Sequence, residues 1–321
     1  MSLWREIFTA ANAEGSQRKR RELNGIQASA PSPRTLCVSA VNCRIRYAPN
    51  RNVFLNMDFL TEIMALKRAR LEVAKKERRA EDLRAHAEEV RRNSQPHALR
   101  LALGNRERLN VIAEFKRASP SKGLIRADAN ESQMALAYEA GGAAAISVLT
   151  EEDRFRGSLG DLSAIRAAVR IPVLRKDFIF EEYQLYESAA AGADALLLIV
   201  AALDDETLRR LRRATEDELR MDALVEVHTA DEMRRATAAG ATLVGVNNRD
   251  LRSFNVSLDV SVNLARDATA NITLVAESGL RSSDVLRRLR ALGYIGFLIG
   301  ETLMRASEPE KTLRKLLEDV D

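Results

Sequence analysis

Cysteine and histidine are scarce in this chain. Its 321 residues include two cysteines, Cys37 and Cys43, and three histidines, His86, His97 and His228. Without cysteine after residue 43, the rest of the chain can have no disulfide framework, thiolate nucleophile or cysteine-ligated metal. The histidines are scattered and lack the short spacings typical of metal ligands. We therefore expect a protein that works without a metal.

Long apolar runs are also absent. No stretch approaches the roughly 18 apolar residues that a membrane-spanning helix needs. The longest apolar run beside an expected strand, Ala193–Leu203, is interrupted by Asp194. Apolar residues still make up 46% of the chain, which is enough for a sizeable core. The sequence thus predicts a soluble protein with no membrane partner.

The net charge of +4 is unevenly distributed. Residues 1–57, called the leader below, contain nine Lys or Arg and three Glu. This leaves 41 basic and 43 acidic side chains in residues 58–321. A basic surface able to bind nucleic acid would need its excess charge on the folded body. Because the excess lies in the leader, we expect no nucleic-acid partner, and a nucleic-acid-binding module is a minor alternative.

The leader has the composition of a targeting segment. Between Leu23 and Met57 it contains no Asp or Glu, although it contains four Arg and four Ser or Thr. Acid-poor leaders with Arg and Ser are typical of organelle transit peptides. Glu6 and Glu14 depart from that pattern, so a disordered tail or a misassigned start codon stays an alternative. A transit peptide would place the protein in a plastid (chloroplast); otherwise we expect it in the cytoplasm.

A helical extension follows the leader. Phe59, Leu60, Ile63 and Leu66 recur at helical spacing within a densely charged stretch, residues 58–93. The charges from Lys67 to Arg92 mix both signs, which is typical of a solvated helix face. We expect one domain over residues 58–321, with helices in residues 58–109 preceding its main body.

From Asn110 onward, short apolar runs alternate with amphipathic stretches. The eight runs are Val111–Lys116, Ala144–Leu149, Val173–Phe178, Ala195–Val200, Ala223–Val227, Leu243–Asn247, Thr273–Ala276 and Gly296–Ile299. Helical patterns cover Glu131–Ala140, Leu159–Val169, Glu181–Ala191, Asp205–Leu219, Ala230–Ala239 and Ser282–Leu292, and several end near a glycine: Gly141, Gly192, Gly240 and Gly293. Eight such units predict an α/β fold, a (β/α)8 TIM barrel. A doubly wound open sheet is the alternative, but its Gly-x-Gly-x-x-Gly fingerprint is missing after the first run.

Charged side chains stand at the ends of these apolar runs, where a barrel places its active site. Burying an unpaired charge is costly, so such groups need partners or a function. Residues two apart on a strand share a face, which pairs Glu114 with Lys116, Lys176 with Phe178, and Asn247 with Arg249. Glu226 and Glu277 end two further runs. One such residue could be a rim ion pair, but two lysines and three glutamates predict a polar active site.

Two later loops suggest a phosphate site. Barrels often bind phosphate with the loops after strands seven and eight. Here those loops contain Ser278-Gly279 and Gly300-Glu301, and the glycines would let backbone N–H groups approach an anion. Either glycine alone could simply begin a helix. The segment Arg117–Gly123 is a polar loop that is either a mobile active-site loop or a plain connector.

These residues resemble the indole-3-glycerol-phosphate synthase family. Val111–Gly123 (VIAEFKRASPSKG) is similar to the family's signature, which runs from its first strand into the next loop. LRKDF at 174–178, LVEV at 224–227, GVNNRDL at 245–251, AESG at 276–279 and LIGE at 298–301 follow in the family's order. The resemblance covers about residues 58–320 and leaves out the leader.

The resemblance implies a carboxy-lyase of tryptophan biosynthesis that uses no cofactor. Its reaction would convert 1-(2-carboxyphenylamino)-1-deoxyribulose 5-phosphate to indole-3-glycerol phosphate by ring closure, decarboxylation and dehydration. By resemblance Lys176 is the general acid and Glu226 the general base. Lys116 would pair with substrate anions and share the acid role, while Glu114 and Asn247 would position the reacting groups.

The remaining residues implied by the resemblance bind substrate. Arg249 and Glu277 would hold the polar network together, Phe178 would pack on the aromatic ring, and Ser119 would assist from the first loop. The phosphate site would be formed by Ser278, Gly279, Gly300 and Glu301, with Glu301 acting through its backbone N–H.

The expected protonation states follow from general chemistry. A lysine inside a cleft among other cations can have its pKa lowered toward working pH. A glutamate in an apolar strand can have its pKa raised. Such a pair would pass protons without a metal or organic cofactor.

Two alternatives to this function stay open. Another phosphate-binding barrel enzyme, such as phosphoribosylanthranilate isomerase, would share the later glycines but would not need Lys116, Lys176 and Glu226 together. A catalytically inactive barrel could serve as a binding partner. We expect one activity, because the sequence ends after the eighth helix, and we leave open an association with other tryptophan-pathway enzymes.

Overall fold

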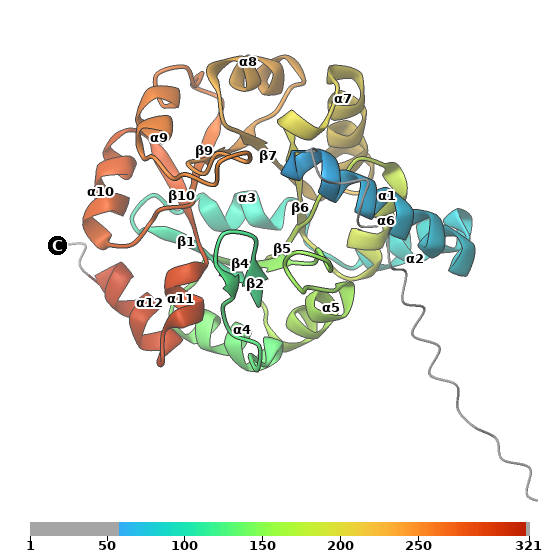
Figure 1. Ribbon diagram of the computed structural model, residues 1–321, viewed down its shortest axis with the longest axis horizontal. Coiled ribbons are helices and arrows are strands. Elements are labelled where there is room, and N and C mark those ends of the chain that lie inside the picture. Colours follow the sequence, from blue (N-terminus) through green and yellow to red (C-terminus); the bar gives the residue numbers. More distant parts are fainter. Residues whose placement is uncertain (1–57, 319–321) are drawn as a thin grey trace, which may run out of the picture. The chain divides into compact units, whose positions relative to one another are not determined.

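A closed ring of eight parallel strands forms the centre of the fold (Figure 1). The computed structural model describes residues 58–318, so the predictions made for the leader lie outside the described residues. The ring runs in the order β1-β10-β9-β8-β7-β6-β5-β4. Its strands are β1 (Asn110–Phe115), β4 (Ala145–Leu149), β5 (Val173–Lys176), β6 (Ala195–Ile199), β7 (Asp222–Val227), β8 (Leu243–Asn247), β9 (Thr273–Glu277) and β10 (Tyr294–Ile299). The predicted barrel is confirmed, and the open-sheet alternative is wrong.

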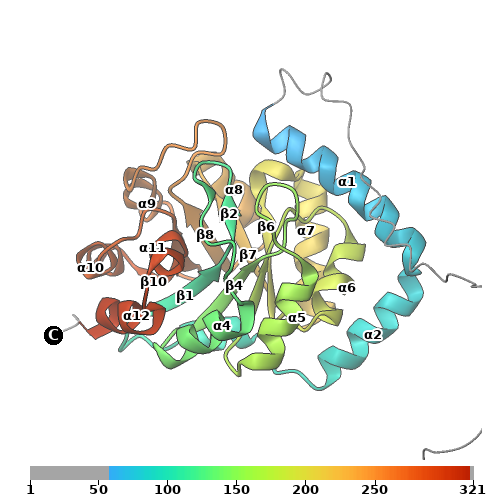
Figure 2. The same cartoon turned by 60° about the horizontal axis from the view of Figure 1, so that its bottom comes forward.

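Helices surround the ring on the outside, as Figure 2 shows from the side. The predicted helical stretches correspond to α4 (Glu131–Ala140), α5 (Leu159–Ala168), α6 (Glu182–Ala190), α7 (Asp205–Arg213), α8 (Ala230–Ala238) and α10 (Ser283–Ala291). Three helices lie outside the stretches named in the prediction: α9 (Asp259–Leu264), α11 (Glu301–Arg305) and α12 (Pro309–Glu318). No helix within residues 58–318 is long and apolar enough to cross a membrane.

Two helix ends differ from the prediction. Residues 205–219 do not form one α-helix, because α7 ends at Arg213 and one π-helical turn, Ala214–Glu218, follows it. After α4 the left-handed glycine is Gly142, with φ 92°, and the preceding Gly141 keeps helical dihedrals. The glycines that follow the other predicted helices, Gly192, Gly240 and Gly293, do have positive φ.

The extension before the barrel contains three helices: α1 (Phe59–Glu77), α2 (Ala80–Arg92) and α3 (Ala98–Leu103). Asp58 begins α1, since its side chain accepts a hydrogen bond from the Thr61 backbone N–H at 2.8 Å. Such caps satisfy a donor that the first helical turn leaves free. The predicted helix over 58–93 is therefore two helices, α1 and α2, which meet at Arg78 and Arg79.

Each strand separates two apolar layers because successive side chains point to opposite faces. Residues such as Val111, Val173 and Val225 pack outward with the surrounding helices. An inner cluster fills the ring with Ile112, Leu174, Leu197, Leu224, Val275 and Leu298. Two residues further along β1, β5, β7 and β9, the inner positions become Glu114, Lys176, Glu226 and Glu277. The polar site is thus the continuation of the inner layer at the carboxyl ends of the strands.

Helix α3 closes the amino-terminal end of the ring (Figure 1). Its Leu99 and Leu103 are fully buried in the inner cluster. Gly296 on β10 permits this contact, since a Cβ there would lie 2.9 Å from Val275 Cγ2 and 3.4 Å from Leu103 Cδ2. The Arg100 backbone N–H also donates to Asp222 Oδ2, at the start of β7, at 2.9 Å. Helix α3 therefore covers the inner cluster at the amino-terminal end of the ring.

We expect Leu99→Ala to lower the free energy of unfolding by about 2–5 kcal/mol, because it leaves a cavity in the inner cluster. The matched control is Leu101→Ala in the same helix, where the side chain is 59% exposed. The control should stay within about 0.5 kcal/mol of the parent. Urea unfolding followed by circular dichroism measures both, and equal losses would contradict the role assigned to α3.

Candidate active site

A cavity of about 450 Å³ opens at the carboxyl ends of the strands. Every residue that the sequence predicted for the site lines it: Glu114, Lys116, Ser119, Lys176, Phe178, Glu226, Asn247, Arg249, Glu277, Ser278, Gly279, Gly300 and Glu301. They come from the ends of six strands and from the loops that follow them. The structure therefore brings the predicted set together in one place.

Lys176 occupies the centre of the polar group. Its Nζ lies 2.9 Å from Glu226 Oε2 and 2.9 Å from Glu277 Oε2. Both carboxylates are about 1% exposed, so little water competes for these bonds. Beside them Lys116 forms an ion pair with Glu114, as expected for inward neighbours on one strand. Three carboxylates and two ammonium groups thus share one buried region.

Two glycines provide the space for these acids. A Cβ at Gly245 on β8 would lie 2.1 Å from Glu277 Oε1. A Cβ at Gly300 would lie 2.1 Å from Glu114 Oε1 and 3.0 Å from Lys116 Nζ. Real Cβ atoms do not approach so closely, so any larger residue would displace a charged side chain. Gly300, first considered for phosphate contact, therefore also accommodates the β1 ion pair.

The pKa shifts of the expected proton-transfer pair are opposite to the prediction. Burial opposes the charge on Lys176, but the carboxylates of Glu226, Glu277 and Glu114 outweigh it and raise the pKa of Lys176. Burial disfavours ionised Glu226, yet the charges of Lys176 and His228 and bonds from Lys176 and Asn247 lower its pKa overall. The prediction was wrong because the nearest neighbours of Lys176 are acids, and not other cations.

Glu277 is the acid that burial favours in its neutral form. Burial, with repulsion from Glu226 and Glu114, outweighs the attraction of Lys176 and raises the pKa of Glu277 to about 7. Its Oε1 is buried without a hydrogen-bond partner. Among three crowded carboxylates, one is expected to retain a proton. The resting site thus contains a protonated lysine, an ionised Glu226 and a Glu277 that titrates near neutrality.

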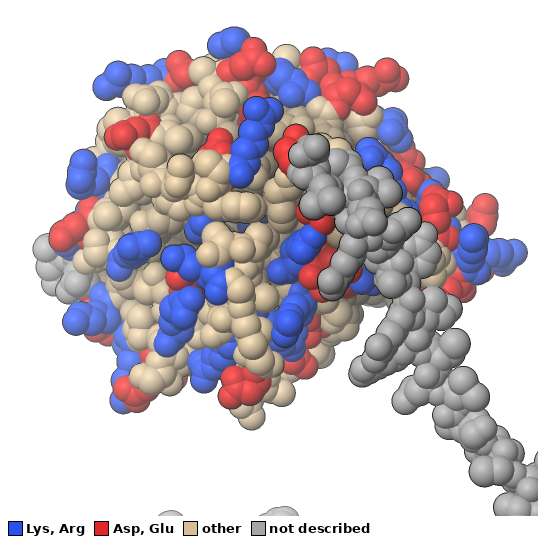
Figure 3. Space-filling view, viewed as in Figure 1, with Lys and Arg blue, Asp and Glu red and all other residues tan. Residues whose placement is uncertain are grey.

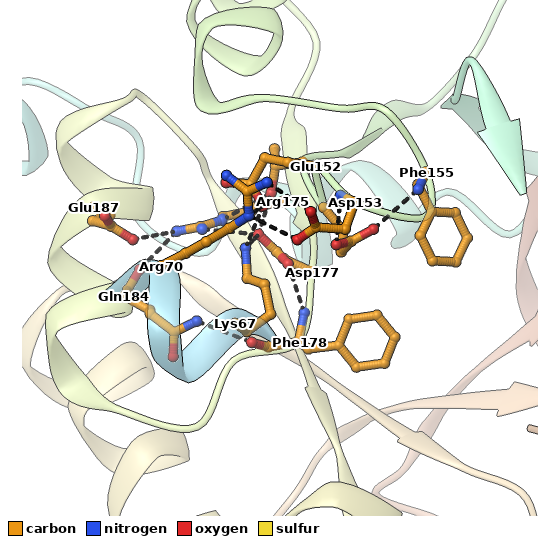
Figure 4. Close-up of polar contacts among 12 residues, drawn as sticks. Lys67, Arg70, Glu152, Asp153, Phe155, Arg175, Asp177, Phe178, Gln184 and Glu187 are labelled. Carbon is orange, nitrogen blue, oxygen red and sulfur yellow. Dashed lines mark hydrogen bonds and ion pairs between the residues drawn. The ribbon is translucent and has the colours of Figure 1, made fainter. Parts of the chain in front are cut away.

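The end of β5 is fixed by Asp177, which Figure 4 shows among Lys67, Arg175 and Phe178. One carboxylate oxygen of Asp177 accepts from Lys67 Nζ at 2.9 Å, from Arg175 Nη2 at 2.9 Å and from Thr150 Oγ1 at 2.6 Å. The other accepts from the Phe178 backbone N–H at 2.9 Å. Burial opposes the charge of Asp177, but the charges of Lys67 and Arg175 and the bonds from Thr150 and Lys67 outweigh it and lower the pKa of Asp177 to about 2. The turn at Asp177 also explains why β5 ends before the predicted Phe178.

Helix α1 is anchored to this turn. Lys67, 5% exposed, bonds Glu152 at 3.1 Å as well as Asp177. One turn further on, Arg70 bonds both carboxylate oxygens of Asp153 at 2.7 Å. The anchored helix carries Phe59 to the cavity, where its ring centroid lies 6.3 Å from that of Phe178.

The segment Arg117–Gly123 is part of a short hairpin and not a plain loop. Strands β2 (Ala118–Ser119) and β3 (Gly123–Leu124) pair antiparallel, and the hairpin lines the cavity with Ser119, Ser121 and Lys122. Arg249 Nη1 donates to Ser121 Oγ at 3.2 Å and to the Phe254 carbonyl at 3.2 Å. Arg249 therefore joins two loops at the mouth. Its expected role, to hold the polar network together with Glu277, stays a prediction.

The mouth of the cavity favours anions. Ser278 and Gly279 both have left-handed backbones, with φ 64° and 79°, and such successive residues can direct their N–H groups to one point. Lys122, Arg281 and Arg305 line the same cavity. Figure 3 shows Lys and Arg side chains around the central hollow of this face, with most Asp and Glu toward the rim.

One group of acids in residues 58–318 has the spacing to hold a metal: Glu151, Glu152 and Asp153. Its oxygens already have other partners. Glu151 accepts three backbone N–H bonds, Glu152 pairs with Lys67, and Asp153 pairs with Arg70. This group fixes the loop after β4 against α1.

A family model described as indole-3-glycerol phosphate synthase matches residues 60–316. The chain belongs to the indole-3-glycerol phosphate synthase family. A relative of that name from Carboxydothermus hydrogenoformans is 46% identical over 263 residues, 81% of this chain and 99% of the relative. Another, from Syntrophobacter fumaroxidans, is 45% identical over 260 residues, 81% of this chain and 97% of the relative. Family members are carboxy-lyases of tryptophan biosynthesis acting on a small phosphorylated substrate, which decides against the isomerase alternative.

Solved structures of distant sequence share the fold alone. A 3-hexulose-6-phosphate synthase from Salmonella typhimurium has a TM-score of 0.53 at 14% identity, and covers 66% of this chain and 98% of its own. A thiamine phosphate pyrophosphorylase from Pyrococcus furiosus has a TM-score of 0.50 at 19% identity, and covers 67% of this chain and 96% of its own. The indole-3-glycerol phosphate synthase family match is the specific finding.

One side of the cavity is lined by phenylalanine rings, called the aromatic wall below, and only Phe178 among them was predicted from the sequence. Phe59, Phe155 and Phe254 line the cavity together with Phe178. The Phe59 and Phe254 ring centroids are 5.1 Å apart, and those of Phe155 and Phe178 are 6.4 Å apart. Phe59 and Phe254 are 195 positions apart in the chain, so no local pattern joins them. The aromatic wall depends on the position of α1, because Phe59 is the first residue of that helix.

We expect Lys67→Met to lower the free energy of unfolding by about 3 kcal/mol, since it leaves Asp177 buried with fewer partners. Arg175 and Thr150 remain, which keeps the loss at the lower end of the usual range. The control is Lys75→Met, because Lys75 forms partly exposed ion pairs on the same helix. That control should lose less than about 1 kcal/mol. A loss of similar size in both variants, measured by urea unfolding, would show that Lys67 is not an anchor.

Proposed function

We propose that this cavity closes the indole ring of 1-(2-carboxyphenylamino)-1-deoxyribulose 5-phosphate by lysine and glutamate acid–base catalysis. The observation that supports it best is Lys176 held between the buried carboxylates of Glu226 and Glu277, each at 2.9 Å. The raised pKa of Lys176 and the lowered pKa of Glu226 keep a proton donor and a proton acceptor side by side. These are the forms that a general acid and a general base must have before reaction.

In the proposed first step the aryl carbon that bears the carboxylate bonds to the ketone carbon. Lys176 gives its proton to the ketone oxygen as that bond forms. The carboxylate then leaves as CO2, and the electron pair of its C–C bond restores the aromatic ring. Finally a second acid protonates the new hydroxyl, which leaves as water, while Glu226 takes the proton whose loss completes the indole double bond. We assign this second protonation to Lys116, because it lines the same cavity.

The rest of the cavity can accommodate the other parts of this substrate. We assign its phosphate to the backbone N–H groups of Ser278, Gly279, Gly300 and Glu301, beneath the basic mouth. The aromatic ring would lie against Phe178 and the other rings of the wall. Glu114 and Asn247 would position the reacting groups, and Ser119 and Arg249 would contact the substrate from the mouth.

We expect Lys176→Met and Glu226→Gln each to lower kcat about 10²–10⁴-fold, because each removes one proton-transfer group. The assay mixes the full chain with the carboxyphenylamino deoxyribulose phosphate and follows indole fluorescence. The controls are Lys311→Met and Glu308→Gln, which remove an exposed ion pair on the surface. Full activity in either active-site variant would refute the assigned role. A folded parent without turnover would refute the function and leave the inactive barrel as the remaining alternative.

We also propose that the leader, residues 1–57, directs this enzyme to a plastid, on the strength of its acid-poor, Arg-containing composition. Fusing residues 1–57 to a fluorescent protein tests this in plant cells. Plastid fluorescence is expected, and it should disappear when Arg34, Arg44 and Arg46 are replaced by Glu. Diffuse cytoplasmic fluorescence of the unaltered fusion would refute it. We propose no nucleic-acid or membrane partner, and association with other pathway enzymes stays a prediction.

A further inference from the structure

A buried histidine contacts the proposed general base. His228 directly follows β7, and its side chain is 12% exposed. Its Nε2 lies 3.4 Å from Glu226 Oε1, which is an ion-pair distance, and it makes no hydrogen bond. On the other side of the ring, Nδ1 lies 3.2 Å from Glu232 Oε2, in the first turn of α8. The His228 backbone N–H donates to the same Glu232 oxygen at 2.7 Å, which fixes Glu232 in place.

The protonation of the ring follows from these contacts. An ionised carboxylate can only accept, so the Nδ1 that faces Glu232 must carry a hydrogen. In a neutral ring Nε2 would then present a lone pair to Glu226 Oε1, and two acceptors would face each other. Only the doubly protonated imidazolium donates to Glu232 and also places a positive charge, and not a lone pair, beside Glu226 Oε1.

The charges around His228 favour the same form. Acids face it from every side: Glu226 on β7, Glu232 on α8, Glu277 on β9 and Asp250 in the loop after β8. Lys176 is the nearby cation, and it binds the far oxygen of Glu226. Burial opposes the positive ring, but the bond to Glu232 and the charges of Glu226, Glu232 and Glu277 outweigh it and raise the pKa of His228.

We propose that His228 is a positioning residue for Glu226: its imidazolium, held by Glu232, keeps the Glu226 carboxylate ionised and oriented toward Lys176. Glu226 then lies between two cations, with Lys176 at Oε2 and His228 at Oε1. The contact between His228 and Glu226 is observed in the structure. Its effect on catalysis rests on the proposed function, in which Glu226 is the general base.

The consequence for pH dependence has a definite sign. The base must be ionised to accept a proton, so activity is lost as pH falls through the pKa of Glu226. Removing the positive ring removes a charge that favours ionised Glu226, and the pKa of Glu226 then rises. The acid limb of the kcat profile should therefore move to higher pH, with little change in KM.

The first test is an NMR titration of the three histidines in the full chain. His86→Asn and His97→Asn assign the signals, because His228 is the only other histidine. The pKa of His228 should lie above its usual value of 6.5 and should fall in Glu226→Gln, which leaves the other two histidines unchanged. An unchanged His228 titration in Glu226→Gln would overturn the proposal, whether or not the enzyme is active.

The second test measures the kcat profile of His228→Asn, whose amide can still donate to Glu232 but carries no charge. We expect its acid limb to move up by about one unit, which is about tenfold in rate on the acid side. Glu232→Gln retains an acceptor oxygen without charge and should shift the limb in the same direction by less. His86→Asn is the control, because His86 is exposed on α2.

The outcomes separate the two proposals. If the acid side of the kcat profile does not move in either His228→Asn or Glu232→Gln, His228 has only a packing role and the proposal is wrong. If His228→Asn fails to fold, as judged by its thermal unfolding, Glu232→Gln decides the question. A parent that does not turn over the substrate refutes the proposed function, and the NMR coupling between His228 and Glu226 then decides the positioning role alone.

Discussion

The positions of the other groups in this site depend on the ion pair of Lys176 with Glu226 and Glu277. Burying two carboxylates so deeply is unfavourable unless a cation satisfies them at short range. One ammonium group serves both, so its position has little freedom. The turn at Asp177, the missing side chain at Gly245 and the contact with His228 all act on the geometry of this one group. A displacement at any of them would leave a buried charge without its partner.

The barrel, and the four charged residues that face its interior, can be predicted from the pattern of residues along each strand. Alternation along each strand places Glu114, Lys176, Glu226 and Glu277 on the inner face, where Ile112, Leu174, Leu224 and Val275 precede them. That pattern needs no knowledge of which strands are neighbours. Glycines after strands also indicate where anions can approach. The barrel prediction held because it depends on spacing within single elements, and the family prediction held because whole motifs resemble those of the family.

The predicted pKa shifts failed because they depend on distances between elements, whereas the helix ends that differed are local. The direction of the Lys176 pKa shift could not be found from sequence, because its partners lie 50 and 101 positions away. The same reason hides the anchor between Lys67 and Asp177 and the contact of Phe59 with Phe254. His228 was visible only as an isolated histidine, since its meaning comes from Glu232 and Glu226 on either side of the ring. The hairpin β2–β3 was missed because each of its strands has two residues.

The anchor of α1 also constrains the order in which the molecule can be completed during synthesis. Lys67 leaves the ribosome well before Asp177, which follows it by 110 positions. The ring itself cannot close until β10 pairs with β1, which needs Ile299 beside Ala113. For much of translation, residues 59–77 are therefore present before the partners that cover Lys67 and Ile63 in the finished fold have been synthesised. Apolar surface that waits for its partners in this way is exposed to aggregation while the chain grows.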